Sequence, residues 1–340
     1  MKREWRFKKV KVALILIGVL FVASLAVRIY NSHRFHLERQ TRVMMDTYVS
    51  IYAVGPKRVT SRAIDVALNR MQEVDRKFSI HNSKSPVYAF NHQGVPITDQ
   101  EILMVVRRAL EVARDSEGAF DITIGPLSEL WGFYGESPHI PSAQAIKETM
   151  GRVGYRYLLV EEGRLQKAKE SIRIDLGGIA KGYGVREAAR VLREEGVSSA
   201  LIDAGGDVYA LGKRGRKLWK VGIRSPREED LLGYLEVEDL AVMGSGDYER
   251  FFIKDGKRYH HIFDPKTGYP AEGLSGLTLV HPDPLEADAW NTALFVLGAK
   301  RGLEMVERTP GMEAIMVTKS GEVLYSSGMK NRLNPISGIE

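Results

Sequence analysis

Apolar residues recur along the chain at two spacings, and each spacing predicts a different kind of element. Residues 47–54 are rich in β-branched and aromatic side chains, which indicates a strand. In residues 60–78 the apolar positions lie three or four apart, which is the spacing of one helix face: Ile64, Ala67, Leu68, Met71, Val74 and Phe78. The chain therefore begins its folded part with a strand followed by an amphipathic helix.

The same reasoning predicts elements along the rest of the chain. We expect helices at 101–116, 138–149, 185–195 and 288–297, with a short helical piece at 303–306. Strands are expected at 157–160 and 171–175, paired around Glu162-Gly163, and at 200–203, 207–211, 219–223, 235–237, 251–254, 277–280, 314–317 and 323–326. Helices and strands interleave, many strands form meanders, and no internal repeat or linker divides the body. These patterns predict an α+β (mixed α/β) fold, with mixed sheets and packed helices in a single body.

The N-terminus has a different character. A basic segment at 1–11 precedes 16 residues without a charge, 12–27, and Arg28 follows. This pattern predicts a signal anchor or signal peptide at 1–30, followed by a linker at 31–40 and a folded domain at 41–340. Ser24-Leu-Ala26 offers a cleavage site, but an uncleaved apolar helix is favoured because Ile29 and Tyr30 lengthen the run. A buried core helix is disfavoured beside so many cations.

The distribution of charge supports this division. The net charge is +6, but residues 1–40 contribute +7, so the remaining 300 residues are close to neutral. A nearly neutral body argues against nucleic acid as a partner. The basic flank is expected to stay in the cytoplasm, which places the folded domain on the extracytoplasmic side of the inner membrane. The chain has no cysteine, which excludes disulfides, thiolate metal sites and a cysteine nucleophile.

The predicted late helix carries the first candidate chemistry. Asp288 and Thr292 are four residues apart and therefore share a helix face. A carboxylate and a hydroxyl are hard oxygen donors of the kind that Mg²⁺ prefers. The alternative is that Asp288 only caps the helix and Thr292 has no special role.

A glycine-rich stretch is the second candidate for a functional site. Residues 174–184 combine a predicted strand, four glycines and Lys181 before a predicted helix, an arrangement suited to binding a phosphate through backbone N–H groups. The stretch matches neither the Walker nor the dinucleotide fingerprint, so a tight joint without a ligand stays open. The second glycine pair, Gly205-Gly206, is expected either to pass close to a ring or phosphate or to form a bulge.

Two further stretches contain candidate polar groups. His260 and His261 are adjacent on a predicted strand and must point to opposite faces, so at most one is expected to reach a site, as a general base or acid. The alternative is a half-buried strand histidine. Asp121, beside Phe120, is expected either to hydrogen-bond the edge of a heterocycle or to cap local backbone.

Taken in order, these stretches resemble the ApbE family, the FAD:protein FMN transferases, over nearly all of the chain after about residue 41. The resemblance is carried by Met45-Asp46-Thr47, Phe120-Asp121, Gly125-Pro126-Leu127, Asp175 to Gly182, Gly205-Gly206-Asp207, Ser245-Gly246-Asp247-Tyr248, His261, Asp264-Pro265, Thr267-Gly268, Ala287-Asp288 and Thr292. It implies that FMN is transferred from FAD to a Thr or Ser hydroxyl of an acceptor protein, with release of AMP. The implied acceptors are flavoprotein subunits of membrane or extracytoplasmic electron-transport systems.

The resemblance also implies site residues. Mg²⁺ would be held by Asp288, Thr292 and the backbone carbonyl of Gly178. His261 would assist attack by the acceptor hydroxyl. The residues expected to line FAD are Met45, His81, Ala119, Phe120, Asp121, Asp175 and Lys181.

Two positions depart from the family pattern. Asp46 stands where a glycine is usual, and His81 stands where an aromatic Tyr or Trp usually stacks on the flavin. Two other functions stay open beside the transferase: an FAD pyrophosphatase that passes the phosphoryl group to water, and an FAD-binding protein without turnover. Asp288, Thr292 and His261 argue against the second, because a binding protein needs neither a metal pair nor a base.

Overall fold

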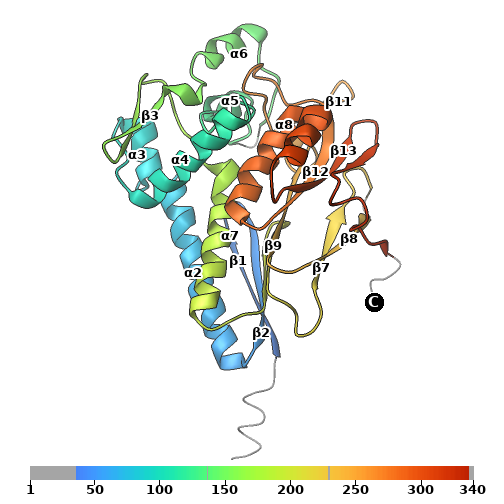
Figure 1. Ribbon diagram of the computed structural model, residues 1–340. Helices are drawn as coiled ribbons and strands as arrows, with labels where there is room; N and C mark the ends of the chain where they lie inside the picture. The colour runs from blue at the N-terminus through green and yellow to red at the C-terminus, as the bar shows by residue number, and fades with distance from the viewer. Residues whose placement is uncertain (1–35, 136, 229, 337–340) are drawn as a thin grey trace, which may run out of the picture.

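The computed structural model describes residues 36–135, 137–228 and 230–336, and its centre is an eight-stranded sheet (Figure 1). The strand order is β1-β2-β5-β6-β9-β12-β13-β14, and every neighbouring pair is antiparallel. The strands are β1 (His36–Met44), β2 (Thr47–Gly55), β5 (Ala200–Ala204), β6 (Asp207–Leu211), β9 (Leu240–Gly246), β12 (Leu274–His281), β13 (Glu313–Thr318) and β14 (Val323–Tyr325).

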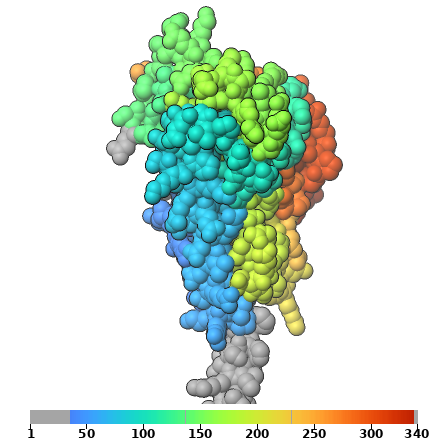
Figure 2. Space-filling view, turned by 90° about the vertical axis from the view of Figure 1, so that its left-hand side faces the viewer, coloured from blue at the N-terminus to red at the C-terminus, as the bar shows by residue number. Residues whose placement is uncertain are grey.

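Three long helices cover one face of this sheet. They are α2 (Lys57–Phe78), α7 (Gly177–Glu194) and α8 (Pro284–Arg308), and α7 packs between the other two. One hydrophobic core lies between α2, α7 and strands β2, β5 and β6, and a second joins α4 (Gln100–Asp115), α7 and α8 to β12 and β13. Figure 2 looks at the side where α2, in blue, and the segment through α4, in cyan, form the surface.

The other elements cover the remaining parts of the sheet. The hairpin of β7 (Trp219–Arg224) and β8 (Leu231–Val237) packs its apolar side chains against the sheet face opposite the helices. Three short helices, one 3₁₀ turn and two further hairpins complete the fold. The helices are α3 (Pro86–Gln93), α5 (Gly125–Leu130) and α6 (Ala143–Met150), and the 3₁₀ turn is η1 (Tyr155–Tyr157). The hairpins are β3 (Leu158–Glu161) with β4 (Arg164–Lys167), and β10 (Phe251–Lys254) with β11 (Lys257–His260).

Most predicted elements are confirmed. The six apolar positions that predict a helix over 60–78 are all buried in α2. The strand at 47–54 is also present, and the helix predicted at 138–149 is present but begins later, at Ala143, with Ser142 as its N-cap. The mixed α/β fold is therefore the one expected, with a uniformly antiparallel main sheet.

Several further boundaries differ from the prediction. Residues 36–40, expected in the linker, belong to β1 and pair with β2. Residues 171–175 are not a strand. Glu162 and Gly163 both have positive φ and form a two-residue hairpin turn, so the strand that pairs with β3 is β4, which begins directly after the turn. Helix α7 begins at Gly177 rather than 185. The two pieces predicted at 288–297 and 303–306 correspond to the two parts of α8 on either side of Gly298, whose φ of 75° interrupts the helix, although the first part begins earlier, at Pro284.

The N-terminal predictions fall on residues that the structure does not describe. The signal anchor or signal peptide at 1–30 lies wholly outside the described range. Among the described residues, no helix has both the length and the apolar composition required to cross a bilayer.

Candidate active site

The start of α7 lies against α8 at the centre of the site. A Cβ on Gly182 would stand 2.2 Å from the Pro284 carbonyl oxygen and 2.5 Å from Asp288 Cβ, so only glycine fits there. The Gly182 N–H donates to Asp288 Oδ2 at 2.7 Å. In a regular helix that N–H would be directed at the carbonyl four residues earlier, which belongs to Gly178. The glycines predicted to form a loop therefore allow two helices to approach closely.

Asp288 is buried and does not cap its helix. The N-cap of α8 is Asp283, whose side chain accepts from the Leu285 N–H at 2.8 Å. Burial raises the pKa of Asp288 to about 7; Lys181 acts in the opposite direction and Asp207 adds to the increase. The capping alternative is wrong, and Asp288 is a carboxylate whose charge requires a cation nearby.

Gly178 and Thr292 face one another across the same junction. A Cβ on Gly178 would lie 3.4 Å from Thr292 Oγ1 and 3.1 Å from Phe120 Cε2. The three predicted metal ligands, Gly178, Asp288 and Thr292, are thus brought to one place by α7 and α8, with Phe120 beside them.

The donors at this junction fit Mg²⁺. Among the described residues, no group of three or more His, Cys, Asp or Glu side chains is arranged to hold a metal ion. One carboxylate, one hydroxyl and a backbone oxygen are a partial set that substrate phosphates and waters would complete, as is usual for Mg²⁺. Asn291 Oδ1, one helical turn from Asp288, is buried and has no hydrogen-bond partner in the described part of the chain. A bound ligand or water would satisfy such a group.

Lys181 is held in place by Asp207. The Lys181 ammonium forms an ion pair with Asp207 Oδ2, and Asp207 Oδ1 accepts from the Gly244 N–H at 3.0 Å. Burial opposes the charge on Lys181, but Asp207 and Asp288 outweigh burial and raise its pKa. The site therefore contains a permanently charged ammonium whose position is fixed by β6 and β9.

Asp175, just before α7, connects to two aromatic side chains. The Tyr134 hydroxyl donates to Asp175 Oδ2 at 2.5 Å, and the Gly177 N–H donates to Asp175 Oδ1 at 2.8 Å. Burial and the Asp175 charge raise the pKa of Tyr134. The His81 ring lies edge-on to Tyr134, with centroids 5.5 Å apart and planes at 88°. His81 and Asp175, both predicted to contact FAD, are therefore linked by Tyr134.

The turn between β1 and β2 reaches the same region. Met45 and Asp46 both have positive φ, 52° and 57°, as a two-residue hairpin turn requires. A Cβ on Gly184 would lie 2.8 Å from Met45 Cε, so this side chain packs on α7. The backbone conformation explains why glycine suits position 46 and why Asp46 carries a conformational cost.

His261 approaches the site from β11. Its N–H donates to the Arg250 carbonyl at 3.2 Å, and its Nδ1 lies 3.3 Å from the same oxygen. Because a carbonyl only accepts, Nδ1 carries the proton and Nε2 keeps a free lone pair. Burial, together with the cations Arg250 and Lys181, lowers the pKa of His261 to about 3, so the imidazole is neutral. His260 is 1% exposed and packs edge-on against Phe295, whereas the His261 ring lies near Phe133, so the two histidines have different surroundings.

Other predicted positions have local roles. Both carboxylate oxygens of Asp121 accept hydrogen bonds from protein groups, from the Thr123 N–H and hydroxyl and from the Tyr155 N–H. Asp121 thus caps local backbone, one of its two alternatives. Ala119 is buried next to Phe120, and its contact with FAD stays a prediction. Gly205 and Gly206 form the tight turn of the β5–β6 hairpin, with φ of 69° and 96°.

Three residues at the site had no role assigned from the sequence. Asp207 lies within a stretch that resembles the family, and Tyr134 and Arg250 come shortly after such stretches, so their positions were visible but their roles were not. Tyr134 holds Asp175, Asp207 holds Lys181, and Arg250 lies beside His261.

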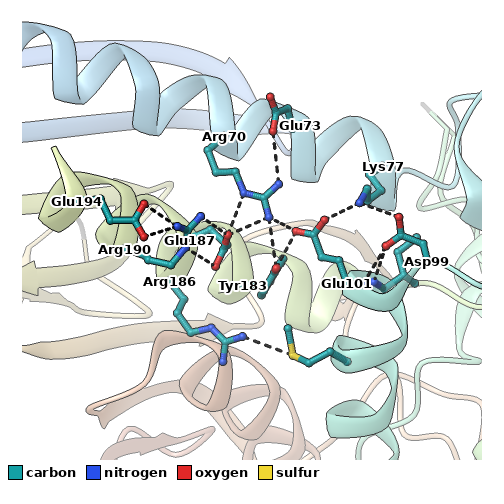
Figure 3. Close-up of polar contacts among 12 residues, drawn as sticks. Arg70, Glu73, Lys77, Asp99, Glu101, Tyr183, Arg186, Glu187, Arg190 and Glu194 are labelled. Atoms are coloured by element: carbon teal, nitrogen blue, oxygen red, sulfur yellow. Dashed lines mark hydrogen bonds and ion pairs between the residues drawn. The ribbon is translucent and has the colours of Figure 1, made fainter. Parts of the chain in front are cut away.

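A network of charges clamps the start of α7 to α2 and α4 (Figure 3). Arg70 Nε donates to Glu187 Oε2 at 2.9 Å, and Arg70 also pairs with Glu101. The Tyr183 hydroxyl donates to Glu101 Oε1 at 2.7 Å, and Lys77 pairs with Glu101 Oε2 at 2.6 Å. Since Tyr183 directly follows Gly182, this network fixes the part of α7 that faces α8.

Comparisons with known proteins agree with this geometry. The model of the ApbE family matches residues 45–316. The FAD:protein FMN transferase of Escherichia coli K12 is 36% identical over 262 residues, covering 73% of this chain and 74% of its own. That of Treponema pallidum is 32% identical over 307 residues, covering 84% and 85%.

Solved structures show the same fold. The crystal structure of the ApbE protein of Thermotoga maritima superposes with a TM-score of 0.82 at 34% identity, covering 88% of this chain and all of the other. The apo flavinyl transferase ApbE of Pseudomonas stutzeri gives 0.77 at 30% identity, covering 88% and 97%. On its sequence, its fold and the order of its site residues, the chain belongs to the ApbE family.

Proposed function

We propose that this chain is a flavin transferase that moves FMN from FAD to a hydroxyl of an acceptor protein and releases AMP. The observation that carries the proposal is the junction of α7 and α8, where Gly178, Asp288 and Thr292 converge beside the Lys181 ammonium, whose charge also acts on the neutral ring of His261. The names of the relatives, FAD:protein FMN transferase, support the reaction.

The metal ligands and their chemistry form one part of the proposal. Asp288, Thr292 and the Gly178 carbonyl would hold Mg²⁺, which would offset the charge of the FAD diphosphate when bound. Lys181, oriented by Asp207, would bind the same diphosphate and stabilise the charge that develops on it.

His261 would receive the proton of the acceptor. Its neutral ring, with a proton on Nδ1, leaves Nε2 free to accept from the Thr or Ser hydroxyl. The hydroxyl oxygen forms a bond to the FMN phosphorus while the bond from that phosphorus to the bridging oxygen breaks, and AMP leaves with the bonding electrons. An anionic diphosphate beside Arg250 and Lys181 would offset the cations that lower the pKa of His261, making it a better base in the complex.

The flavin would lie on the side of Asp175, where His81, Tyr134 and Met45 are exposed or partly exposed. His81 offers an imidazole face in place of a larger aromatic ring. We further propose that the basic and apolar N-terminal residues hold this domain on the extracytoplasmic side of the inner membrane, where acceptor flavoprotein subunits of electron-transport systems would meet it.

The test is incubation of the chain with FAD, Mg²⁺ and a flavin-free acceptor domain, followed by a denaturing gel viewed for flavin fluorescence. A fluorescent acceptor band together with AMP is the expected result. Free FMN and AMP without a labelled band would instead assign the pyrophosphatase activity, and FAD that stays intact would leave a binding protein.

A further inference from the structure

We infer that the end of the folded domain where β1 begins rests on the anionic lipid surface of the bilayer, through the loop at 212–218 and the first turn of α2. The inference rests on the proposed N-terminal anchoring, because it names the face that the anchored domain turns toward the membrane. This end lies at the bottom of Figure 1. Six exposed cations define it as the basic end: Lys57, Arg58, Lys213, Arg214, Arg216 and Lys217.

Hydrogen bonds through Ser199 place the two cationic segments at the same end of the sheet. The Val54 N–H, in β2, donates to the Ser199 carbonyl at 2.9 Å, and the Ser199 hydroxyl donates to the Lys213 carbonyl at 2.5 Å. Lys57 lies two residues after the end of β2, and His36, the first residue of β1, pairs with the last residue of β2. The loop, the first turn of α2 and the start of β1 therefore share one end of the domain.

The carboxylates at the end of α7 and in the β8–β9 turn leave much of this positive charge uncompensated. They are already paired with other side chains, Glu194 with Arg190, Glu195 with Arg62, Glu238 with Lys213 and Asp239 with Arg193. Among the described residues, no carboxylate forms an ion pair with Lys57, Arg58, Arg216 or Lys217.

The position of two of these cations is unfavourable for the fold alone. Lys57 and Arg58 occupy the first turn of α2, where the helix dipole disfavours positive charge, and no acidic residue in that turn offsets them. An anionic surface outside the domain would offset this cost.

Exposed apolar side chains accompany the cations. Val59 is 39% exposed next to Arg58, and Leu218 is 36% exposed next to Lys217. Cations are attracted to anionic headgroups, and apolar side chains beside them insert at the boundary between headgroups and acyl chains. The combination therefore fits a lipid surface.

The chain itself brings the basic end to the bilayer. The predicted anchor ends at residue 30, and residues 31–35 join it to His36, so the start of β1 stays within about 20 Å of the lipid surface. The loop at 212–218 follows β6, three strands from β1 in the sheet, which is a distance of about 14 Å. An anchored domain therefore holds these cations within reach of the headgroups.

This orientation sets the height of the active site above the membrane. The turns at Met45-Asp46 and Gly205-Gly206 lie at the opposite end of the sheet from the start of β1. Because β1 has nine residues, the two ends are roughly 30 Å apart. The acceptor hydroxyl must therefore be presented at about that height above the lipid.

The experiment uses the full-length chain reconstituted into vesicles, with one introduced cysteine as the sole labelling site, because the sequence has none. Leu218→Cys carries a fluorophore at the basic end. Val43→Cys is the matched control, because Val43 is 68% exposed near the opposite end of β1. A quencher attached to lipid headgroups reports contact with the bilayer, in vesicles of phosphatidylcholine alone or mixed with the anionic phosphatidylglycerol.

In the anionic vesicles we expect quenching at position 218 to be at least threefold stronger than at position 43. It should fall to the level in phosphatidylcholine when the four unpaired cations are removed together, in Lys57→Gln, Arg58→Gln, Arg216→Gln and Lys217→Gln. FAD affinity should stay within twofold of wild type in that variant, because the substitutions lie at the end of the sheet away from the site.

The tether alone would hold the basic end near the bilayer in either lipid. Quenching that is the same with and without anionic lipid, or that is unchanged by the four substitutions, would therefore overturn the inference. Shielding of the label at position 218 by an added acceptor domain, and not by lipid, would also overturn it and assign a protein-binding surface. A chain that does not float with the vesicles would refute the N-terminal anchoring itself, which is a different failure.

Discussion

The backbone N–H of Gly182 donates to Asp288 Oδ2 at 2.7 Å, across a contact between α7 and α8 that leaves no room for a Cβ on residue 182. This one hydrogen bond connects the glycine-rich segment to the carboxylate that we propose as a ligand of Mg²⁺. The position of Asp288 therefore depends on the absence of a side chain at residue 182.

Gly182→Ala should separate the two helices. The added methyl would meet the Pro284 carbonyl at 2.2 Å, so we expect a loss of about 2–3 kcal/mol in the free energy of unfolding and at least a hundredfold loss of transfer activity. Urea denaturation and AMP release measure the two effects. Gly151→Ala is the control, because its φ is −64° and its closest contact is 3.3 Å. Wild-type activity in Gly182→Ala would show that the close approach is not required.

The raised pKa of Asp288 predicts a dependence of stability on pH and metal. The pKa is about 7 in the folded chain and ordinarily 3.8, so between these values only the folded state holds the proton. Without metal, the contribution of Asp288 to the free energy of unfolding should therefore be fully present below pH 3.8 and should be lost as the pH rises through 7. Mg²⁺ should restore the melting temperature at pH 8.

Asp288→Asn provides the comparison for that measurement. Asparagine keeps an oxygen for the Gly182 N–H but has no charge to bury. We expect its melting temperature to exceed that of the metal-free wild type at pH 8 and to be indifferent to Mg²⁺, while AMP release is abolished. If the variant and the wild type respond equally to Mg²⁺, the metal ligand has been assigned incorrectly.

Substitution of His261 should affect the transfer rate, whereas substitution of His81 should affect FAD affinity. His261→Ala removes the proton acceptor and should reduce the transfer rate at saturating FAD at least a hundredfold, with little change in FAD affinity. His81→Ala removes the proposed flavin contact and should weaken FAD binding several-fold while transfer at saturating FAD is kept. Single-turnover rates and fluorescence titrations distinguish the two. A pure affinity loss in His261→Ala would contradict its assigned role.

His260 should make the fold sensitive to mild acid. Its Nε2 lies 3.0 Å from the Ala271 carbonyl and its Nδ1 accepts from the Ile262 N–H at 3.3 Å, so the neutral ring is fully satisfied. Burial lowers its pKa to about 4 from 6.5. Between pH 6.5 and 4 the unfolded chain binds a proton at His260 that the folded chain does not bind. About 3 kcal/mol of the free energy of unfolding, present above pH 6.5, should therefore be lost as the pH falls through 4.

Chemical denaturation at pH 7 and pH 4.5 tests this. The free energy of unfolding of His260→Gln should be lower than that of the wild type at pH 7, but it should decrease less between pH 7 and pH 4.5. His81→Gln, whose side chain is exposed, should keep the wild-type dependence. An unchanged pH dependence in His260→Gln would exclude His260 as the source.

Asp46 should cost the fold a small amount of stability. Its φ of 57° is a conformation that glycine adopts freely, so Asp46→Gly should stabilise the chain by about 0.5–1 kcal/mol. Asp46→Ala should have the opposite sign, because alanine has a Cβ and no polar side chain to compensate. Thermal denaturation of both variants gives the comparison, and stabilisation by alanine would show that backbone strain is not the cause.

The sequence predicted what depends on local pattern. The periodicity of α2 follows from burial of one helix face, the β-branched and aromatic composition of β2 favours a strand, and both elements are present. The start of α7 was placed too late because glycines usually favour turns, whereas here they serve helix packing that only the tertiary structure reveals. The links from Tyr134 to Asp175 and from Asp207 to Lys181 join segments distant in sequence, which no local pattern encodes.

The most direct test of the central claim is the mass of an acceptor domain after incubation with this chain, FAD and Mg²⁺. The account predicts an increase equal to one FMN linked through phosphate to a single Thr or Ser, an equal amount of AMP, and neither product with Asp288→Asn. An acceptor of unchanged mass, or full labelling by Asp288→Asn, would contradict it.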